Sequence, residues 1–320
     1  MGFSWPGESF FNGVFTMKKN ESSLTSLITA FSRAYHVKED RPIIFNDDYA
    51  QNLLLPEEYQ AITTNMTNGI EFFSPEMAGK LKGDSKAILK WITQIQLSPT
   101  PLARAAYAEN VVLHECQLGA EQYVILGAGL DTFAWRHTAL SNVTVFEVDH
   151  PSTQKFKIER LQQVGHNIPP HVKFIAMDFK QELSLDKIVA AGFDISKKTV
   201  FSLLGVTYYL TKKEFQQLLH AFFINLPKGS SIIFDFADQH VFTETGMFNR
   251  VQNMVQMAQA SGEQMKYSSS VVDLEKLLAK EQLLIYEHLA PQDIQKQFFS
   301  NRDDLLQAFE TIHYIHAVKN

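Results

Sequence analysis

The sequence is poor in cysteine and lacks long apolar runs, and both absences narrow what the protein can be. Its 320 residues include one cysteine, Cys116, which excludes an internal disulfide and a cysteine-rich zinc site. No apolar segment reaches the roughly 20 residues of a transmembrane helix, and no charged-then-apolar signal peptide stands at the start. We therefore expect a cytoplasmic protein that does not bind membranes.

Clustered basic residues and paired histidines are also missing. The net charge is −6, from 29 Lys and Arg against 35 Asp and Glu. Because nucleic-acid binding needs clustered cations, we expect no nucleic-acid partner. The 11 histidines show no paired spacing such as HxxxH, and the adjacent acids Asp47 and Asp48 fit a helix-capping turn better than a metal pair. We expect no metal.

What is present is an alternation of helical and strand-like segments after a helical beginning. Residues 22–118 are predicted to be mostly helical, with breaks at prolines. Helical stretches such as 152–164 and 211–225 then separate apolar segments of strand type, which indicates a mostly parallel α/β sheet covered on both faces. The expected strands are 122–127, 143–149, 172–177, 199–206, 230–236, 282–288 and 312–319.

The expected organisation is one integrated domain. Its N-terminal helical region, residues 1–118, would form part of the ligand pocket, and residues 119–320 would form the core. The polar, methionine-containing segment at about 237–280 has no place in a minimal sheet, so we expect it to be a helical lid. The sequence does not indicate an oligomeric state.

The most informative stretch is YVILGAGLDT, from Tyr123 to Thr132. An apolar strand ends in a turn with Gly127 and Gly129, where the absence of Cβ atoms lets the backbone approach a ligand closely. A second strand ends in Asp149, 22 positions beyond Gly127. An acid at that distance in a βαβ unit can hydrogen-bond the hydroxyls of a ribose. The pattern predicts a nucleotide or nucleoside site.

The ligand is predicted to lack phosphate. Dinucleotide folds use GxGxxG, whose third glycine allows close packing at the pyrophosphate. Thr132 occupies that third position here, and Asp131 would repel a pyrophosphate. S-adenosyl-L-methionine, which carries a ribose, a sulfonium and a zwitterionic amino-acid end, fits these residues better.

The sequence resembles the leucine carboxyl methyltransferase family. LGAGLDT followed by FAWR, then FEVDHP, carries the resemblance, which extends over residues 22–236. It implies the class I methyltransferase fold, a Rossmann-like α/β fold with a seven-stranded, mostly parallel sheet whose last strand is antiparallel. It also implies an enzyme that uses S-adenosyl-L-methionine to methylate oxygen in proteins, a modified tRNA base or small molecules.

The resemblance also implies a set of cofactor-binding residues. Gly127 and Gly129 would lie beneath the methionine end, and Asp149 would bind the ribose. Asp178 and the Phe179 backbone would meet the adenine, although Asp149 and Asp178 also fit helix or turn caps. Two arginines, Arg104 and Arg33, match family positions; Arg104 would grip the cofactor carboxylate.

One position departs from the family pattern. Many members carry a glutamate before the glycine of the fourth-strand motif, whereas this chain has Leu204 before Gly205. Leucine cannot bind the ammonium of the methionine end, so Leu204 is expected to be a wall of the cofactor pocket. The change weakens the prediction of a protein C-terminus as the substrate.

Methyl transfer from a sulfonium mainly requires alignment of donor and acceptor and exclusion of water. We expect no dedicated base. Tyr209 matches a family tyrosine and is expected to position the reactants rather than abstract a proton; Tyr208, Asp235, Asp238 and His240 are weaker candidates. Aromatic and methionine side chains of the lid (Phe242, Met247, Phe248 and Met254) would suit a small apolar substrate.

The leading hypothesis is thus O-methylation, at a carboxylate or hydroxyl, of a small and apolar molecule. Three alternatives stay open. They are a protein C-terminal carboxyl methyltransferase, a non-catalytic cofactor-binding module and a nicotinamide-dependent oxidoreductase, the last opposed by the missing third glycine.

Overall fold

The computed structural model describes residues 24–181 and 183–320, so the first 23 residues of the expected helical region lie outside the described residues. Within the described part, a single seven-stranded sheet has the order β3-β2-β1-β4-β5-β7-β6. The strands are β1 (Gln122–Leu126), β2 (Thr144–Asp149), β3 (Val172–Ala176), β4 (Thr199–Leu203), β5 (Ser231–Ala237), β6 (Leu283–Leu289) and β7 (Ile312–Lys319).

The last strand runs against the others. β7 lies between β5 and β6 and pairs antiparallel with both, whereas β1 to β5 pair in parallel. This confirms the predicted mostly parallel sheet with an antiparallel final strand. Each predicted strand is present, and its ends differ from the prediction by at most three residues.

The sheet is buried on both faces, which is why its strands read as continuous apolar runs. All five residues of β1 are buried. Alternate side chains enter different cores: Tyr123 and Ile125 pack with the N-terminal helices and α7, and Val124 and Leu126 pack with α10, α11 and α13 on the opposite face. This alternation follows from the two-residue period of a strand.

The helices are α2 (Leu24–Glu39), α3 (Pro56–Asn68), α4 (Ile70–Phe73), α5 (Pro75–Lys80), α6 (Ser85–Ile92), α7 (Pro99–Gln117), α8 (Phe133–Arg136), α9 (Pro151–Gln163), α10 (Leu185–Ala190), α11 (Lys212–Phe223), α12 (Arg250–Ala260), α13 (Val271–Ala279) and α14 (Pro291–Phe298). Three of the predicted proline breaks prove to be first residues of helices α3, α5 and α7, where proline costs no hydrogen bond. None of the helices in residues 24–181 and 183–320 is long and apolar enough to cross a membrane.

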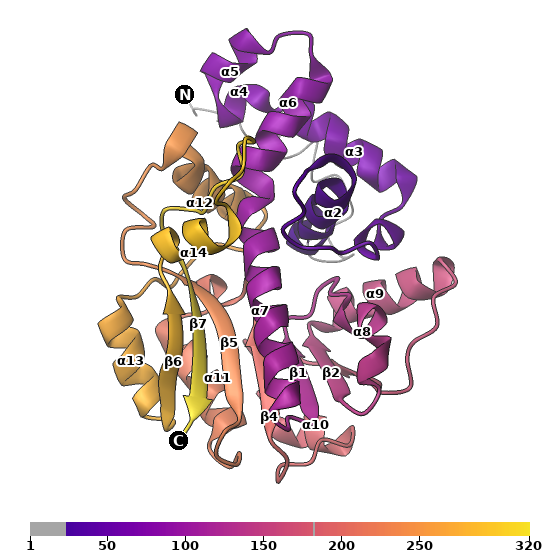
Figure 1. Ribbon diagram of the computed structural model, residues 1–320, viewed down its shortest axis with the longest axis vertical. Helices are drawn as coiled ribbons and strands as arrows, with labels where there is room; N and C mark the ends of the chain where they lie inside the picture. The colour runs from indigo at the N-terminus through magenta and orange to yellow at the C-terminus, as the bar shows by residue number, and fades with distance from the viewer. Residues whose placement is uncertain (1–23, 182) are drawn as a thin grey trace.

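The N-terminal helices stand above one edge of the sheet. Figure 1 shows α2 to α6 beyond the carboxyl ends of the parallel strands, and α7 running from this group down across the sheet. Leu102, Ala103 and Ala106 of α7 are buried in the same core as α2 and the sheet. The helical region and the core are therefore packed together through α7, and the edge beneath α2 is where a ligand of an open α/β sheet is expected to bind.

The segment expected to be a lid divides into two parts. α13 packs on β6, and its Leu274, Leu277 and Leu278 are buried in the sheet core. This helix is a layer of the fold, so the prediction of a lid over all of 237–280 is wrong for α13. Its three leucines recur at helical spacing, which is typical of an apolar helix face that packs on a core. Only the part around α12 lies beside the N-terminal helices.

Candidate active site

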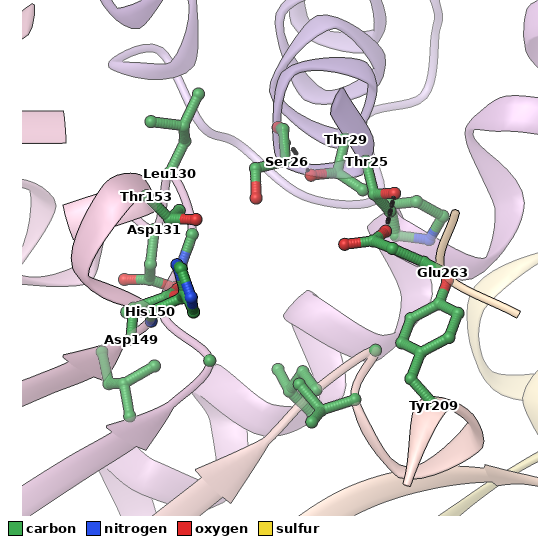
Figure 2. A pocket seen from close by; sticks show the side chains of 18 of the residues that line it. Thr25, Ser26, Thr29, Leu130, Asp131, Asp149, His150, Thr153, Tyr209 and Glu263 are labelled. Atoms are coloured by element: carbon green, nitrogen blue, oxygen red, sulfur yellow. Dashed lines mark hydrogen bonds between the residues drawn. The ribbon is translucent and has the colours of Figure 1, made fainter. Parts of the chain in front are cut away.

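A cavity of about 1140 Å³ lies at the carboxyl ends of the parallel strands, beneath α2. The structure brings all of the predicted site residues to its walls: Arg33, Arg104, Gly127, Gly129, Asp149, Asp178, Phe179, Leu204 and Tyr209. Figure 2 shows Asp149 and His150 on one side of this cavity, Tyr209 and Glu263 on the other, and Thr25, Ser26 and Thr29 of α2 above. Their contacts with a cofactor remain a prediction.

The glycine turn after β1 has the left-handed backbone that favours glycine, with φ of +76° at Gly127 and +51° at Gly129. A Cβ at Gly127 would lie 2.5 Å from Val206 Cγ2, and one at Gly129 would lie 2.8 Å from Ser26 Oγ. The sequence interpretation had a ligand as the reason for the glycines. The structure adds a second reason: Ser26 of α2 and Val206 after β4 lie so close to this turn that a Cβ would not fit there.

Carboxylates of the protein occupy amides that a phosphate would need. Asp149 Oδ2 accepts a hydrogen bond of 2.5 Å from the Gly129 N–H, and Asp131 Oδ1 accepts one of 2.8 Å from the Phe133 N–H at the start of α8. Phosphate binding at a helix N-terminus depends on such amides and on positive potential. The turn is therefore poorly suited to a pyrophosphate.

Asp149 ends β2 and is held firmly. Besides the bond from Gly129, its Oδ1 accepts a bond of 2.5 Å from the His150 N–H. Burial raises the pKa of the Asp149 carboxyl above its ordinary value, although the two backbone bonds oppose this. The side chain still lines the cavity, so its remaining lone pairs can accept from ribose hydroxyls.

Asp178 and Phe179 follow β3 at the next position along the sheet edge. The Asp178 carboxylate accepts bonds from the Lys180 N–H at 3.0 Å and from Gln181 Nε2 at 2.8 Å. The turn-capping alternative is thus present in the structure. Because both residues also line the cavity, capping and adenine binding are compatible.

Arg104 lies on α7 below the loop that follows β4. Its Nη1 is 3.0 Å from Asp235 Oδ2 and 3.3 Å from the Tyr208 hydroxyl. Burial lowers the pKa of the Arg104 guanidinium, but the Asp235 carboxylate and the Tyr208 and Tyr314 phenols together outweigh this, and the net shift is upward. The guanidinium is therefore a permanent cation in the wall of the cavity, as a carboxylate-binding residue must be.

The weaker base candidates do not reach the site in a usable form. Asp235 is fully buried and accepts bonds from Arg104, the Tyr208 hydroxyl and the Gly205 N–H, the last at 2.6 Å. Asp238 and His240 do not line the cavity, and Asp238 lies 3.4 Å from His313. Asp235 was a candidate because β5 ends near the expected reaction site. In the structure its carboxylate is hydrogen-bonded within the protein and stabilises the fold.

Arg33 lies on α2 and is anchored at both ends of its guanidinium. Its Nε is 2.7 Å from Asp47 Oδ2 and its Nη2 donates to the Leu130 carbonyl at 2.7 Å. Asp47 also accepts from the Ala50 N–H at 3.0 Å, at the start of a short 3-10 turn, Ala50–Leu53, which agrees with the capping interpretation. In the described ranges no group of three His, Cys, Asp or Glu residues could hold a metal ion.

The apolar lining expected from the methionine-containing segment is not found. Met247, Met254 and Met257 pack on the helical core, and Met265 is buried. Of this segment only residues 260–263 line the cavity, and they are small or polar. The reason for expecting an apolar substrate is therefore lost.

Sequence reasoning missed two groups. Lys157 and Glu147 form a fully buried ion pair beside the glycine turn, and Lys157 Nζ also donates to the Asp131 carbonyl at 2.6 Å. Burial raises the pKa of Glu147 to about 7 even though Lys157 opposes it. The signal in the sequence was a lysine, Lys157, on the buried face of the helix that follows the strand with Glu147. Thr25 and Glu263 are the other group; they are hydrogen-bonded across the cavity rim, and no motif marks them.

Comparison with known proteins agrees with these features. The model of the family described as leucine carboxyl methyltransferase matches residues 26–223. A Bacillus subtilis (strain 168) protein named "Putative S-adenosyl-L-methionine-dependent methyltransferase YktD" is 55% identical over 304 residues, which cover 95% of this chain and all of that protein. A Mycobacteroides abscessus protein of similar name is 27% identical, covering 79% of this chain and 76% of its own.

Solved structures of low sequence identity share the fold. A Streptomyces avermitilis protein of the duf574 family has a TM-score of 0.58 at 13% identity, covering 94% of this chain and 99% of its own. A Thermobifida fusca chain has a TM-score of 0.52 at 13% identity, covering 99% of both. These likenesses bear on architecture alone.

Proposed function

Because the chain belongs to the leucine carboxyl methyltransferase family, we propose that it transfers a methyl group from S-adenosyl-L-methionine to an oxygen atom of a small molecule. The enzyme is an S-adenosyl-L-methionine-dependent methyltransferase. The observation that carries the proposal is the cavity itself, which is lined by a glycine turn, an acid at the end of β2 and a permanently charged arginine.

The residues present fit this cofactor. The glycine turn leaves its backbone bare on the cavity side, Asp149 offers carboxylate lone pairs to a ribose, and Arg104 offers guanidinium donors to the methionine carboxylate. Leu204 lines the cavity, where its side chain would form an apolar wall beside the cofactor. When bound, the cofactor supplies an electrophilic methyl group on a positively charged sulfur.

The chemistry asks little of the protein beyond alignment. When bound, the cofactor would supply the methyl group, the acceptor oxygen would take it while sulfur keeps the bonding electron pair, and a hydroxyl acceptor would release its proton to solvent. Burial raises the pKa of Tyr209 well above its ordinary value, so this phenol stays protonated. Tyr209 can donate a hydrogen bond and position a reactant, which matches a site without a dedicated base.

The proposal is tested by following the methyl group. The protein is incubated with methyl-labelled S-adenosyl-L-methionine and a Bacillus subtilis extract, which is then separated into protein and metabolite fractions. We expect label among the metabolites, in a product that behaves as an ester or an ether. Label confined to the protein fraction would favour the C-terminal carboxyl methyltransferase instead, and label in neither fraction would contradict the proposal.

A further inference from the structure

The buried ion pair of Lys157 and Glu147 has a role that stability alone does not explain. Each side chain is only 1% exposed, and the Lys157 ammonium donates to Glu147 Oε2. Removing two charges from water is costly, and replacing a buried ion pair by apolar side chains of similar volume is often neutral or stabilising. What apolar side chains cannot supply is a hydrogen-bond donor, so the other bonds of the ammonium indicate its role.

The Lys157 ammonium reaches the segment that follows the glycine turn. It donates to the Asp131 carbonyl at 2.6 Å, and it lies 5.0 Å from the ring centre of Trp135 in α8 and 5.9 Å from that of Phe174 in β3. Asp131 lines the cavity, whereas Lys157 and Glu147 are not among the described residues that line it. Lys157 therefore stands behind the cavity wall and can act on a ligand only through the backbone of Asp131.

Three successive residues of this wall are each bonded to a charged side chain from a different element. Figure 2 shows Leu130, Asp131 and Asp149 on the same side of the cavity. Because a peptide unit is planar, a carbonyl whose oxygen is held also fixes the direction of the N–H on the same unit. The bonds run from the Gly129 N–H to Asp149 after β2 at 2.5 Å, from Arg33 of α2 to the Leu130 carbonyl at 2.7 Å, and from Lys157 of α9 to the Asp131 carbonyl.

Of these three side chains, Lys157 is the one whose effect on a ligand can be isolated. Asp149 and Arg33 line the cavity and are themselves predicted to contact the cofactor. Replacing either of them would remove a ligand contact and loosen the wall at the same time. Replacing Lys157 would change the wall alone.

We propose, on the basis of the cofactor site proposed above, that Lys157 is a positioning residue for S-adenosyl-L-methionine. Its ammonium, held in place by Glu147, fixes the Asp131 carbonyl and with it the shape of the glycine turn that would receive the methionine end. A turn that already has its bound shape loses less conformational entropy when the ligand binds, and this strengthens binding.

The test removes the ion pair without leaving a buried charge. In the double variant Lys157→Met/Glu147→Met, methionine matches the unbranched shape of both side chains and adapts to the apolar surroundings. We expect the Kd of S-adenosylhomocysteine, measured by titration calorimetry, to rise roughly tenfold. The midpoint of urea unfolding should stay at or above that of the wild type, because the apolar pair replaces two buried charges.

The matched control is another buried ion pair on the same helix. Arg160 of α9 bonds to Glu58 at 2.6 Å and to the Leu53 carbonyl at 2.8 Å, and these three residues are not among the described residues that line the cavity. Arg160→Met/Glu58→Met should lose stability, since Glu58 also accepts from the Leu55 N–H at the start of α3. Its affinity for S-adenosylhomocysteine should nevertheless equal that of the wild type.

A conservative variant gives a readout that a purely structural role would not give. Lys157→Arg keeps a cationic donor beside Glu147, so it should bind S-adenosylhomocysteine more tightly than Lys157→Met/Glu147→Met does. Equal affinity in the wild type and Lys157→Met/Glu147→Met, or an equal loss in Arg160→Met/Glu58→Met, would overturn the inference and leave the methyltransferase function standing. A wild type that does not bind S-adenosylhomocysteine would instead overturn the proposed cofactor site, and this inference with it.

Discussion

At the nucleoside end of the cavity, Asp149 has two tasks for one carboxylate. It holds the glycine turn through the Gly129 N–H, and on the proposed function it would offer its remaining lone pairs to the ribose. Arg104 is similar, since the guanidinium that would bind the cofactor carboxylate also bonds to Asp235 and the Tyr208 hydroxyl. The side chains that we propose to bind the ligand therefore also stabilise the shape of the cavity.

Replacement of Asp149 by alanine should weaken the binding of S-adenosylhomocysteine by about 1–3 kcal/mol, because the ribose loses charged acceptors. Asp149→Asn should fall between alanine and the wild type, since its amide oxygen still accepts. Titration calorimetry measures this, with the exposed Asp186→Ala as the control. Equal affinity in wild type and Asp149→Ala would refute the ribose assignment.

A second residue, His316, is predicted to affect the stability of the fold rather than ligand binding. His316 of β7 is buried, and its burial, helped by Lys198 and His114 and opposed by Glu115, lowers its pKa to about 4. A histidine with a lowered pKa in the folded state binds its proton more readily when unfolded. Its contribution to stability is therefore complete above pH 6.5 and is lost as the pH falls from 6.5 towards 4.

In His316→Phe, the unfolding free energy should depend less on pH below 6.5. Between pH 7 and pH 4.5 the wild type should lose about 2–3 kcal/mol of unfolding free energy more than the variant does. Urea unfolding at each pH measures the loss, and His240→Phe, at an exposed position, is the control. Parallel pH profiles for wild type and His316→Phe would show that this histidine is not buried in the neutral form.

At the scale of elements, the loops after β1 and β4 each contribute to the cavity, and both need glycine at positions where other protein atoms come close. Gly205 has a φ of +71°, and a Cβ there would lie 2.5 Å from Arg104 Nη2. Gly165, at the end of α9, has the same φ and no atom within 4 Å of such a Cβ. Alanine variants at these two positions therefore separate the cost of backbone strain from the effect of contact with Arg104.

We expect both Gly205→Ala and Gly165→Ala to lose about 1–2 kcal/mol of stability, because the left-handed conformation is costly for alanine. Only Gly205→Ala should also bind S-adenosylhomocysteine more weakly, since the added methyl displaces Arg104. Thermal melts and calorimetry of the two variants give both quantities. If Gly165→Ala lost affinity to the same extent, the effect would be general strain and Arg104 would not be involved.

The division of the 237–280 segment has its own test. Leu278→Ala, in the core beneath α13, should cost about 2–5 kcal/mol of stability and leave the affinity for S-adenosylhomocysteine unchanged. Met254→Ala, on the half-buried face of α12, should cost less. Urea unfolding and calorimetry compare them. A change in ligand affinity in Leu278→Ala without a loss of stability would mean that α13 behaves as a lid after all.

Sequence reasoning reached the elements with strong local signals. β1, β2 and the turn between β1 and α8 were predictable because buried parallel strands give continuous apolar runs and the turn needs glycine. The antiparallel place of β7 came only from the family resemblance, because strand order is a long-range property. Glu263 and Thr25 were not predictable, since each is an ordinary polar residue on its own element and only folding brings them together.

At the scale of the whole molecule, the helical region and the sheet enclose one cavity between them. α2 provides its roof through Ser26 and Arg33, and the strand ends provide its floor. We therefore propose that residues 1–118 and 119–320 act as one integrated domain. A ligand that fills the cavity would contact both parts and stabilise them together.

The account depends on the kind of ligand that the glycine turn accepts, and titration calorimetry of the full chain with S-adenosylhomocysteine and with NAD⁺ tests this most directly. We predict binding of S-adenosylhomocysteine with a Kd well below about 1 mM, and no binding of NAD⁺, because carboxylates already occupy the amides at the turn. Binding of NAD⁺ together with no heat from S-adenosylhomocysteine at that concentration would contradict the account.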